Sequence, residues 1–401
     1  MYREIEAKAK ALSDTMIQNR RILHKIPETA WQEKETTRFL AAALKEMGYE
    51  IITGEAVAGH ETGVIATLRC QDGPTFVLRF DIDALAANEC SSPSHFPSKA
   101  GFRSGYEGFM HACGHDGHAA IGLGCARLLM DLRHTLRGTI RLIFQPAEEG
   151  GRGAAPIVQR GWLDDADFFL AGHIVGREYT DGQPADVISG VCNSLATTKF
   201  DAIFTGRSCH AASPEQGASV ISAMASAILN LNGIPRHSEG ATFLNIGRIS
   251  AGEGRNIVAG QGKMELEVRG ATTELNQYME NRAFQILQDS AHLYGCQAEI
   301  EIQGNAPSLT SSPELCATLR ALCRERLEFV RVLDTSVPFR ASEDAAVMLE
   351  RVICRGGQGA YLLFPTDTTA PLHSCSYDFN ETILAKAAAV FTAAVYQFCG
   401  R

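Results

Sequence analysis

The sequence predicts an α/β domain, with a mixed and mainly parallel sheet flanked by helices, interrupted by a smaller α+β domain of ferredoxin-like order. Three patterns predict this fold class. Short apolar strand-like runs alternate with helical periodicity in the first half, runs of alternating polarity dominate the middle, and helical periodicity returns near the end. We therefore expect a discontinuous larger domain at 1–193 and 306–401, and an inserted domain at 194–305.

Helical periodicity in the first part covers 3–26 and 34–47, with Pro27 between them, and a later helix is expected at 117–133. The strand-like runs are GVIATLR (63–69), TFVLRFD (75–81), TIRLIF (139–144) and DFFLAGH (167–173). Helices between strands favour a parallel sheet, and ligands bind at the carboxyl ends of its strands. The segments FDID, FQPAEEG and LAGH stand at such ends, so we expect them near a functional site.

The inserted domain begins at about residue 194, where strand-like runs of alternating polarity begin. Its four strand-like runs are TTKFDAIFTG, ATFLNIGRIS, KMELEVRG and CQAEIEIQG. Helical segments at about 215–233 and 272–294 lie between them, which gives the order β-α-β-β-α-β. Helices return after about 306 and are clearest at 313–328 and 381–398.

Composition places the chain among folded globular proteins. It has 401 residues, of which 45% are hydrophobic and 21% are charged. No apolar run reaches the roughly 18 residues of a transmembrane helix, and the start lacks the apolar core of a signal peptide, so we expect a cytoplasmic protein with reduced cysteines. The net charge of −9 argues against nucleic acid and anionic membranes as partners, and it means that an anionic substrate needs a locally basic pocket.

The densest group of metal-ligand side chains lies in the segment HACGHDGH, residues 111–118. Three histidines, Cys113 and Asp116 fall within eight residues, and Gly114 and Gly117 allow the backbone to turn sharply. Cys113 and His115 can therefore converge on one cation. The alternative is a helix N-terminus that Asp116 caps, with the histidines on the surface.

A pair of glutamates, Glu148 and Glu149, follows Pro146 at the end of an apolar strand run. A metal hydrolase needs one carboxylate that binds metal and another that takes a proton from the activated water. Two adjacent glutamates on a bend can supply both functions. Taken by itself such a pair is more often a solvated turn, but its position at a strand end favours the metal site.

Two further carboxylates, Asp81 and Asp83, also stand at a strand end. Strand alternation places both on one face, where they can bind metal or orient a ligand histidine. A simple turn at the end of the strand is an equal alternative.

The lone histidines His173 and His373 are weaker candidates. A single histidine is more often a hydrogen-bonded structural residue than a ligand. His173 nevertheless follows an apolar strand run, and His373 follows Pro371 in a late loop.

Through these motifs, the chain resembles the amidohydrolase branch of the M20 metallopeptidase superfamily. The resemblance runs nearly end to end, through RRILHKIPETAWQE, RFDIDAL, MHACGHDGHAAIGLG, LIFQPAEEG, AGHI and ASED. Within the branch, the chain is most similar to the enzymes that hydrolyse p-aminobenzoyl-glutamate, through SLATTKFDAIFTG, HSEGATFLNIG, GEGRNIV, EVRGA and NQYMENRA.

The resemblance implies a site with two divalent metal ions, Zn²⁺ or Mn²⁺. It implies the ligands Cys113, His115, Glu149, His173 and His373, and it implies that Glu148 is the general base that later protonates the leaving amine. Most of the superfamily has a ligand histidine where this chain has Asp81, which leaves the function of Asp81 open. Asp83 is expected to support a ligand rather than to bind metal.

The resemblance also implies that the inserted domain is a lid and dimerisation domain. His210, in GRSCHAASPEQG, is expected to stabilise the developing oxyanion in the active site of the neighbouring protomer, with a purely structural histidine as the alternative. Asn256 and Arg269 match substrate-holding positions. Lys199, Arg207, Arg255 and Arg269 are expected to form one basic pocket, although any one of them can equally be a surface ion-pairing residue.

The implied activity is hydrolysis of an amide bond next to a free carboxylate, in p-aminobenzoyl-glutamate or another N-acyl amino acid. A general N-acyl-amino-acid amidohydrolase or a dipeptidase is the runner-up. A different class is a non-catalytic, metal-binding partner subunit, because members of this group can work as pairs of homologous subunits. Homodimers and heterodimers with a homologous subunit both stay open.

Overall fold

The computed structural model describes all residues from 1 to 401, and the chain forms two compact units. The larger unit comprises Met1–Cys192, Leu309–Pro338 and Asp344–Arg401, and the smaller unit comprises Asn193–Ser308 and Phe339–Glu343. The sequence-based ranges placed 339–343 in the larger domain. These residues belong to the smaller unit, where Leu195 N donates a 3.2 Å hydrogen bond to Ala341 O.

The larger unit contains a mixed sheet of eight strands in the order β1-β2-β4-β3-β5-β16-β6-β14. These strands are β1 (Glu50–Thr53), β2 (Val64–Arg69), β3 (Gln71–Asp81), β4 (Arg137–Gln145), β5 (Phe168–Gly176), β6 (Val187–Ile188), β14 (Val332–Leu333) and β16 (Gln358–Thr366). β4, β3, β5 and β16 are parallel at the centre, whereas β1 and β2 add antiparallel pairs at one edge. The predicted α/β class with a mainly parallel sheet is therefore confirmed.

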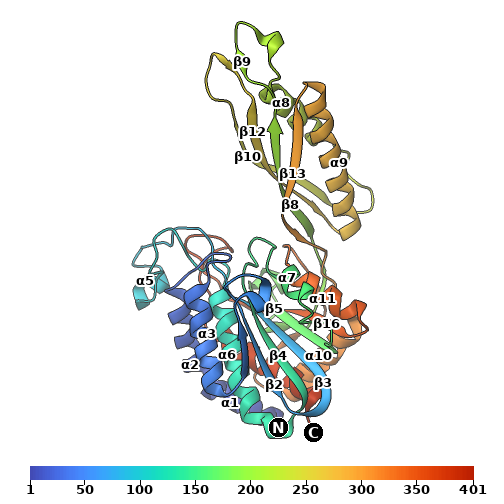
Figure 1. Cartoon of the computed structure of the whole chain (residues 1–401). Helices are drawn as coiled ribbons and strands as arrows, with labels where there is room; N and C mark the ends of the chain where they lie inside the picture. Colours follow the sequence, from blue (N-terminus) through green and yellow to red (C-terminus); the bar gives the residue numbers. More distant parts are fainter. The chain divides into compact units, whose positions relative to one another are not determined.

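Helices cover both faces of this sheet (Figure 1). Leu362 and Phe364 of β16 share a core with α12, whereas Gly359 of the same strand faces Leu349 of α11. Alternation along β16 thus separates two helical layers. The helices of this unit are α1 (Tyr2–Ala11), α2 (Ser13–His24), α3 (Lys34–Met47), α4 (Glu55–Ala58), α5 (Phe96–Ala100), α6 (His115–Leu132), α7 (Ala154–Gln159), α10 (Pro313–Arg326), α11 (Ala345–Cys354) and α12 (Ile383–Cys399).

Helix α6 is the element that brings the HACGHDGH motif to the sheet. It starts at His115, directly after Gly114, whose φ of 91° makes the sharp turn into the helix. At Gly122 an added Cβ would lie 2.6 Å from Phe144 and 2.8 Å from Phe80, so glycine is what lets α6 approach β3 and β4. The first turn of α6 therefore lies against the carboxyl ends of these strands.

The smaller unit is an antiparallel sheet in the order β10-β12-β8-β13, with helices α8 and α9 packed on it. Its main elements are β8 (Ala196–Thr205), α8 (Val220–Asn232), β10 (Thr242–Ala251), β12 (Gln261–Gly270), α9 (Thr273–Leu293) and β13 (Gln297–Ala306). The order along the chain is the predicted β-α-β-β-α-β. Two further sheets have two short strands each. One pairs β9 (Cys209–His210) with β11 (Ile257–Val258), and the other pairs β7 (Val191–Ser194) with β15 (Val337–Phe339). No helix in either unit has the length and apolar character needed to span a bilayer.

Candidate metal centre

Five side chains that the sequence singles out meet at the carboxyl ends of β4 and β5. The potential ligand atoms of Cys113, His115 and His173 lie within 4.8 Å of one another, and so do those of Cys113, Glu149 and His373. They come from the loop before α6, the start of α6, the loop after β4, strand β5 and the loop after β16. The parallel central strands bring these distant segments to one edge of the sheet.

His173 has its ring fixed by its own strand. Its Nδ1 lies 2.6 Å from the backbone oxygen of Ile174, so this nitrogen donates and Nε2 carries the lone pair. Nε2 lies 3.3 Å from the sulfur of Cys113. The lone pair of His173 therefore points into the cluster, as a ligand requires.

His115 is fixed in the same way from the other side. Its Nδ1 donates to the backbone oxygen of Asp83 at 2.9 Å, and its Nε2 lies 3.9 Å from Oε1 of Glu149. This Nε2 is fully buried and has no hydrogen-bond partner, which is costly for a polar atom unless a cation sits beside it. Asp83 also accepts a 3.0 Å bond from the backbone N–H of Glu149, so it supports two candidate ligands at once.

His373 enters the cluster from the loop after β16. Its φ is 66°, an uncommon value for a residue with a side chain, and its N–H donates to Ala112 O at 2.8 Å. Its Nε2 lies 3.5 Å from Oε2 of Glu149. The backbone bond ties this loop to the segment that carries Cys113.

The electrostatics of the cluster also fit a cation. Burial, with the nearby Glu149, raises the pKa of the Cys113 thiol well above its usual value, and burial raises the pKa of Glu149 to about 7 against the opposing effect of His115. Burial holds the pKa of His173 well below its usual value. A divalent cation offsets the cost of ionising the thiol and the carboxyl, and sulfur, imidazole and carboxylate donors suit transition metals.

The adjacent Glu148 lies next to these groups, and the backbone just before it is fixed by Glu33, a residue to which the sequence assigned no function. Ala147 has a φ of 57°, and its N–H donates to Oε1 of the fully buried Glu33 at 2.8 Å. Burial and the charge of Asp83 raise the pKa of Glu33 to about 8. Glu33 therefore holds the bend that presents both glutamates. Glu33 ends the segment RRILHKIPETAWQE that carries the resemblance, but nothing in that segment indicates its contact with Ala147.

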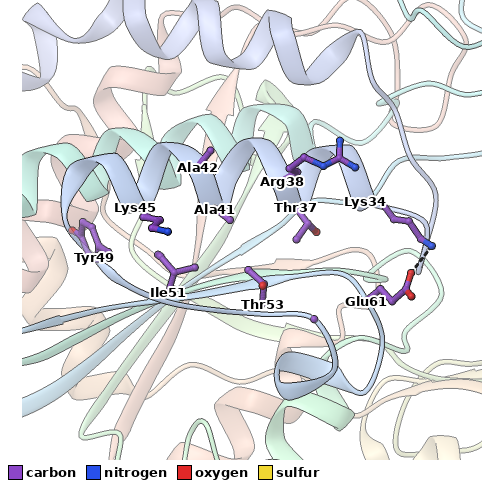
Figure 2. Close-up of a pocket in the computed structure, with 11 residues that line it drawn as sticks. Lys34, Thr37, Arg38, Ala41, Ala42, Lys45, Tyr49, Ile51, Thr53 and Glu61 are labelled. Carbon is purple, nitrogen blue, oxygen red and sulfur yellow. Dashed lines mark ion pairs between the residues drawn. The ribbon is translucent and has the colours of Figure 1, made fainter.

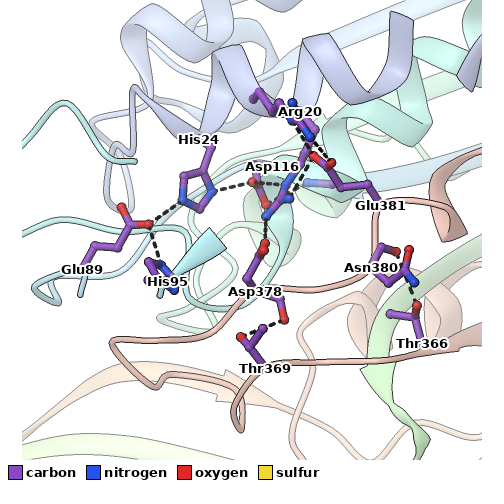
Figure 3. Close-up of polar contacts among 12 residues, drawn as sticks. Arg20, His24, Glu89, His95, Asp116, Thr366, Thr369, Asp378, Asn380 and Glu381 are labelled. Atoms are coloured by element: carbon purple, nitrogen blue, oxygen red, sulfur yellow. Dashed lines mark hydrogen bonds and ion pairs between the residues drawn. The ribbon is translucent and has the colours of Figure 1, made fainter. Parts of the chain in front are cut away.

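The histidines of the HACGHDGH motif are buried, so the alternative of a surface helix start is wrong. His111, His115 and His118 are each no more than 2% exposed. Asp116 accepts hydrogen bonds from Arg20 at 2.9 Å and from Nδ1 of His24 at 2.7 Å. These bonds belong to a buried network, drawn in Figure 3, that continues to Glu89, His95, Asp378 and Glu381.

Comparison with known proteins identifies the family. The pattern of peptidase family M20/M25/M40 matches residues 77–397. The chain belongs to this family. Among curated proteins, it is 38% identical to one of the subunits of the p-aminobenzoyl-glutamate hydrolase of Escherichia coli, over 91% of this chain and 92% of that protein. It is 37% identical to indole-3-acetyl-aspartic acid hydrolase of Enterobacter agglomerans, over 94% of each chain.

A solved structure extends the likeness to a metal-binding member of the family. A dinuclear metal-binding M20 peptidase of Bacillus subtilis superposes with a TM-score of 0.73 at 28% identity, covering 97% of this chain and 99% of that one. The resemblance predicted from the motifs is thus confirmed. This M20 protein is a metallo-amidohydrolase, and the cluster described above is its candidate metal centre.

The smaller unit of this M20 hydrolase carries the predicted substrate residues in two groups. His210 in β9 pairs with Ile257 in β11, and Ala211 N donates to Asn256 O, so His210, Arg255 and Asn256 lie together. The exposed His210 accepts at Nδ1 from Ala212 N at 3.1 Å, which leaves Nε2–H free to donate.

The second group lies at the other end of the sheet, so the expected single basic pocket is wrong for one chain. Arg269 pairs with Thr197 across β12 and β8, and Lys199 pairs with Glu267. Arg207 and Arg255 lie beyond the opposite end, where Gln261 pairs with Thr205. At about 3.4 Å per residue, the eight steps from residue 261 to residue 269 span roughly 27 Å. Arg269 is also held by a bidentate bond to Glu267, at 3.1 Å for each contact.

A surface groove between α3 and β1 is separate from this chemistry (Figure 2). It encloses about 610 Å³ and is lined by residues that include Lys34, Arg38, Lys45 and Ile51. None of the candidate ligands lines it. We therefore assign no part of the hydrolytic site to this groove.

Proposed function

We propose that this M20 hydrolase cleaves N-aroyl or N-acyl amino acids, with p-aminobenzoyl-glutamate, which yields p-aminobenzoate and glutamate, as the leading substrate. The convergence of Cys113, His115, Glu149, His173 and His373 at one strand edge carries the proposal. The names of both curated relatives describe an aromatic acyl group joined to an acidic amino acid. A general N-acyl-amino-acid amidohydrolase or dipeptidase is the runner-up.

The five converging side chains are the proposed ligands of two divalent ions, Zn²⁺ or Mn²⁺. When bound, the ions acidify water and polarise the amide carbonyl. The chain supplies fixed donors for them, because Nδ1 of His115 and Nδ1 of His173 are each tied to a backbone oxygen. Both Nε2 atoms are thereby directed to one place, and Glu149 and Cys113 lie beside them.

Glu148 is the proposed proton carrier. It follows a bend that Glu33 fixes, and one of its carboxylate oxygens lies within 4.8 Å of ligand atoms of Glu149 and His115. In this function Glu148 takes a proton from the attacking water and gives it to the departing nitrogen as the C–N bond breaks. The proton removed from water thus ends on the leaving amine.

The smaller unit is the proposed lid and dimerisation domain, and the larger unit the catalytic domain. We assign the substrate carboxylates to Arg269 and Lys199 at one end of the lid sheet. At the other end, His210, Arg255 and Asn256 would serve a neighbouring subunit, in a homodimer or a heterodimer. Nε2–H of His210 is then a donor for the developing oxyanion.

We place the protein in the cytoplasm, because Cys113 can bind metal only in the reduced form.

The test is hydrolysis by the purified chain alone after reconstitution with Zn²⁺ or Mn²⁺. The panel contains p-aminobenzoyl-glutamate, indole-3-acetyl-aspartate, an N-acetyl amino acid and a dipeptide. We expect the highest kcat/KM on p-aminobenzoyl-glutamate. A Glu148→Gln variant should keep its metal and lose at least a hundredfold in kcat. Full activity in that variant excludes the assigned base, and metal binding without turnover on any compound favours a non-catalytic partner subunit.

A further inference from the structure

His118 uses both of its ring nitrogens inside the protein. Its Nδ1 lies 2.5 Å from Oδ1 of Asp81, and its Nε2 accepts a 2.9 Å hydrogen bond from the backbone N–H of Ile174. A backbone N–H can only donate, so Nε2 is unprotonated and Nδ1 carries the hydrogen that Asp81 accepts. A ligand histidine needs a free lone pair, and His118 has none to offer.

Asp81 is held at both oxygens as well. Oδ1 accepts from His118, and Oδ2 accepts from Nη1 of Arg79 at 2.6 Å. The side chain is fully buried. Asp81 therefore orients a histidine and neutralises an arginine.

The backbone of Ile174 connects His118 to a proposed ligand. Its N–H bonds to His118, and the backbone oxygen of the same residue accepts from Nδ1 of His173 at 2.6 Å. The rings of His118 and His173 also pack edge to face, with centroids 4.6 Å apart, and the ring of His115 lies 5.4 Å from that of His118. His118 thus contacts the rings of two proposed ligands and fixes the backbone that aims one of them.

Arg79 extends the network to the loop that carries Glu148 and Glu149. Besides Asp81, its guanidinium donates to Oε1 of Gln145 at 2.8 Å and to Oδ1 of Asp344 at 3.1 Å. Oδ2 of Asp344 accepts from Gly153 N at 3.1 Å and from Ala154 N at 3.0 Å. Gln145 and Gly153 flank the loop that carries Glu148 and Glu149, so one arginine is connected to both ends of it.

We propose that Arg79, Asp81 and His118 form a positioning network, which sets the direction of His173 and the course of the Glu148–Glu149 loop without binding a cation. The inference rests on the proposed metal centre. A buried ionic network of this kind is a weak source of stability, so its value lies in fixing one geometry. It also assigns Asp81, whose function the sequence left open, to the support of other side chains.

Two substitutions of His118 separate its two bonds. Asn places its amide near the position of Nδ1 and can still donate to Asp81, whereas Gln reaches toward Nε2 and can still accept from Ile174. Metal content per chain at saturating Zn²⁺, metal affinity by chelator competition, and kcat and KM on p-aminobenzoyl-glutamate are measured for each. We expect unchanged metal content, with affinity or kcat lowered about 10- to 100-fold in His118→Asn. We expect a smaller loss in His118→Gln and little change of KM in either variant.

Arg79→Lys tests the hydrogen bonds that connect the network to the loop carrying Glu148 and Glu149. Lysine keeps the charge but cannot bind Asp81, Gln145 and Asp344 at once. Arg141→Lys is the matched control, because Arg141 lies buried on the adjacent strand and pairs with Asp165 outside the network. We expect kcat to fall about tenfold or more in Arg79→Lys and to stay within about twofold in the control.

Three outcomes decide the inference. Loss of a metal ion from His118→Gln would make His118 a ligand and overturn it. Wild-type affinity and kcat in both His118 variants would remove the positioning function, while the metal centre itself stood. A wild-type chain that neither binds metal nor hydrolyses any compound of the panel would reject the proposed function and the inference together.

Discussion

Nε of Arg20 donates a 2.9 Å hydrogen bond to Oδ2 of Asp116, although 96 residues separate them and both side chains are about 1% exposed. The same guanidinium also bonds to Asp378 and Glu381 (Figure 3). Asp116 directly follows His115, and Asp378 belongs to the loop that carries His373. The buried guanidinium of Arg20 therefore links helix α2 to two segments of the proposed metal centre.

Replacing Arg20 with methionine should destabilise the larger unit strongly. The change leaves Asp378 buried without its cation and leaves Asp116 with His24 alone, and breaking a buried ion pair by removing one partner costs about 3–5 kcal/mol. Urea unfolding followed by tryptophan fluorescence measures the loss. Arg3→Met is the control, because its ion pair with Glu328 is exposed on both sides and should change stability by less than about 1 kcal/mol. Equal unfolding midpoints in the two variants would contradict the importance of the network.

Because of His24, the free energy of unfolding should decrease as the solution becomes alkaline. Burial lowers its pKa, but the bonds to Asp116 and Glu89 outweigh burial and raise it to about 9, from an ordinary value of 6.5. Between these values the folded chain binds more protons than the unfolded chain, so the free energy of unfolding decreases with rising pH. The contribution is complete below about pH 6.5 and is lost as pH passes 9.

The measurement is the unfolding midpoint between pH 6 and pH 10. A His24→Gln variant should show a flatter decline than the wild type over this range, whereas substitution of the exposed His134 should leave the slope unchanged. A wild-type midpoint that does not decline across this interval would rule out a protonated His24.

Strand ends could be predicted from the sequence, but pairing between strands could not. The apolar runs ending in FDID, FQPAEEG and LAGH become β3, β4 and β5, and their carboxyl ends do meet. The basic pocket failed because residue spacing says nothing about register, which puts Arg269 and Arg255 at opposite ends of one sheet. Arg20 and Glu33 were missed for a related reason. Both lie in the segment RRILHKIPETAWQE, but their partners are far away in the sequence, so the segment alone indicates neither contact.

Cys113→Ser should weaken metal binding without harming the fold. Serine retains the size of the side chain but removes the soft thiolate, and the contact of Cys113 with Nε2 of His173 belongs to the cluster itself. We expect metal affinity to fall by tenfold or more, with thermal stability unchanged in the presence of a chelator. Cys125→Ser is the matched control, since Cys125 on α6 is also buried but belongs to the hydrophobic core and to no candidate ligand group, and it should affect stability alone. Identical metal affinity in the wild type and Cys113→Ser would exclude the sulfur as a ligand.

The pairing of Arg269 with Glu267 leads to a prediction about substrate affinity. Glu267 occupies the Nε and Nη2 edge of the guanidinium at 3.1 Å for each contact, so a substrate carboxylate has to compete with Glu267 for bidentate binding at that edge. Glu267→Gln removes the competing charge and should lower KM for p-aminobenzoyl-glutamate by several-fold. Arg269→Lys loses the bidentate geometry and should raise KM by about tenfold or more. Arg248→Lys serves as the control, because Arg248 lies on the edge strand β10 in an exposed pair with Glu265. If Arg269 only stabilises its own sheet, both substitutions at the pair will lower the melting temperature and leave KM where it was.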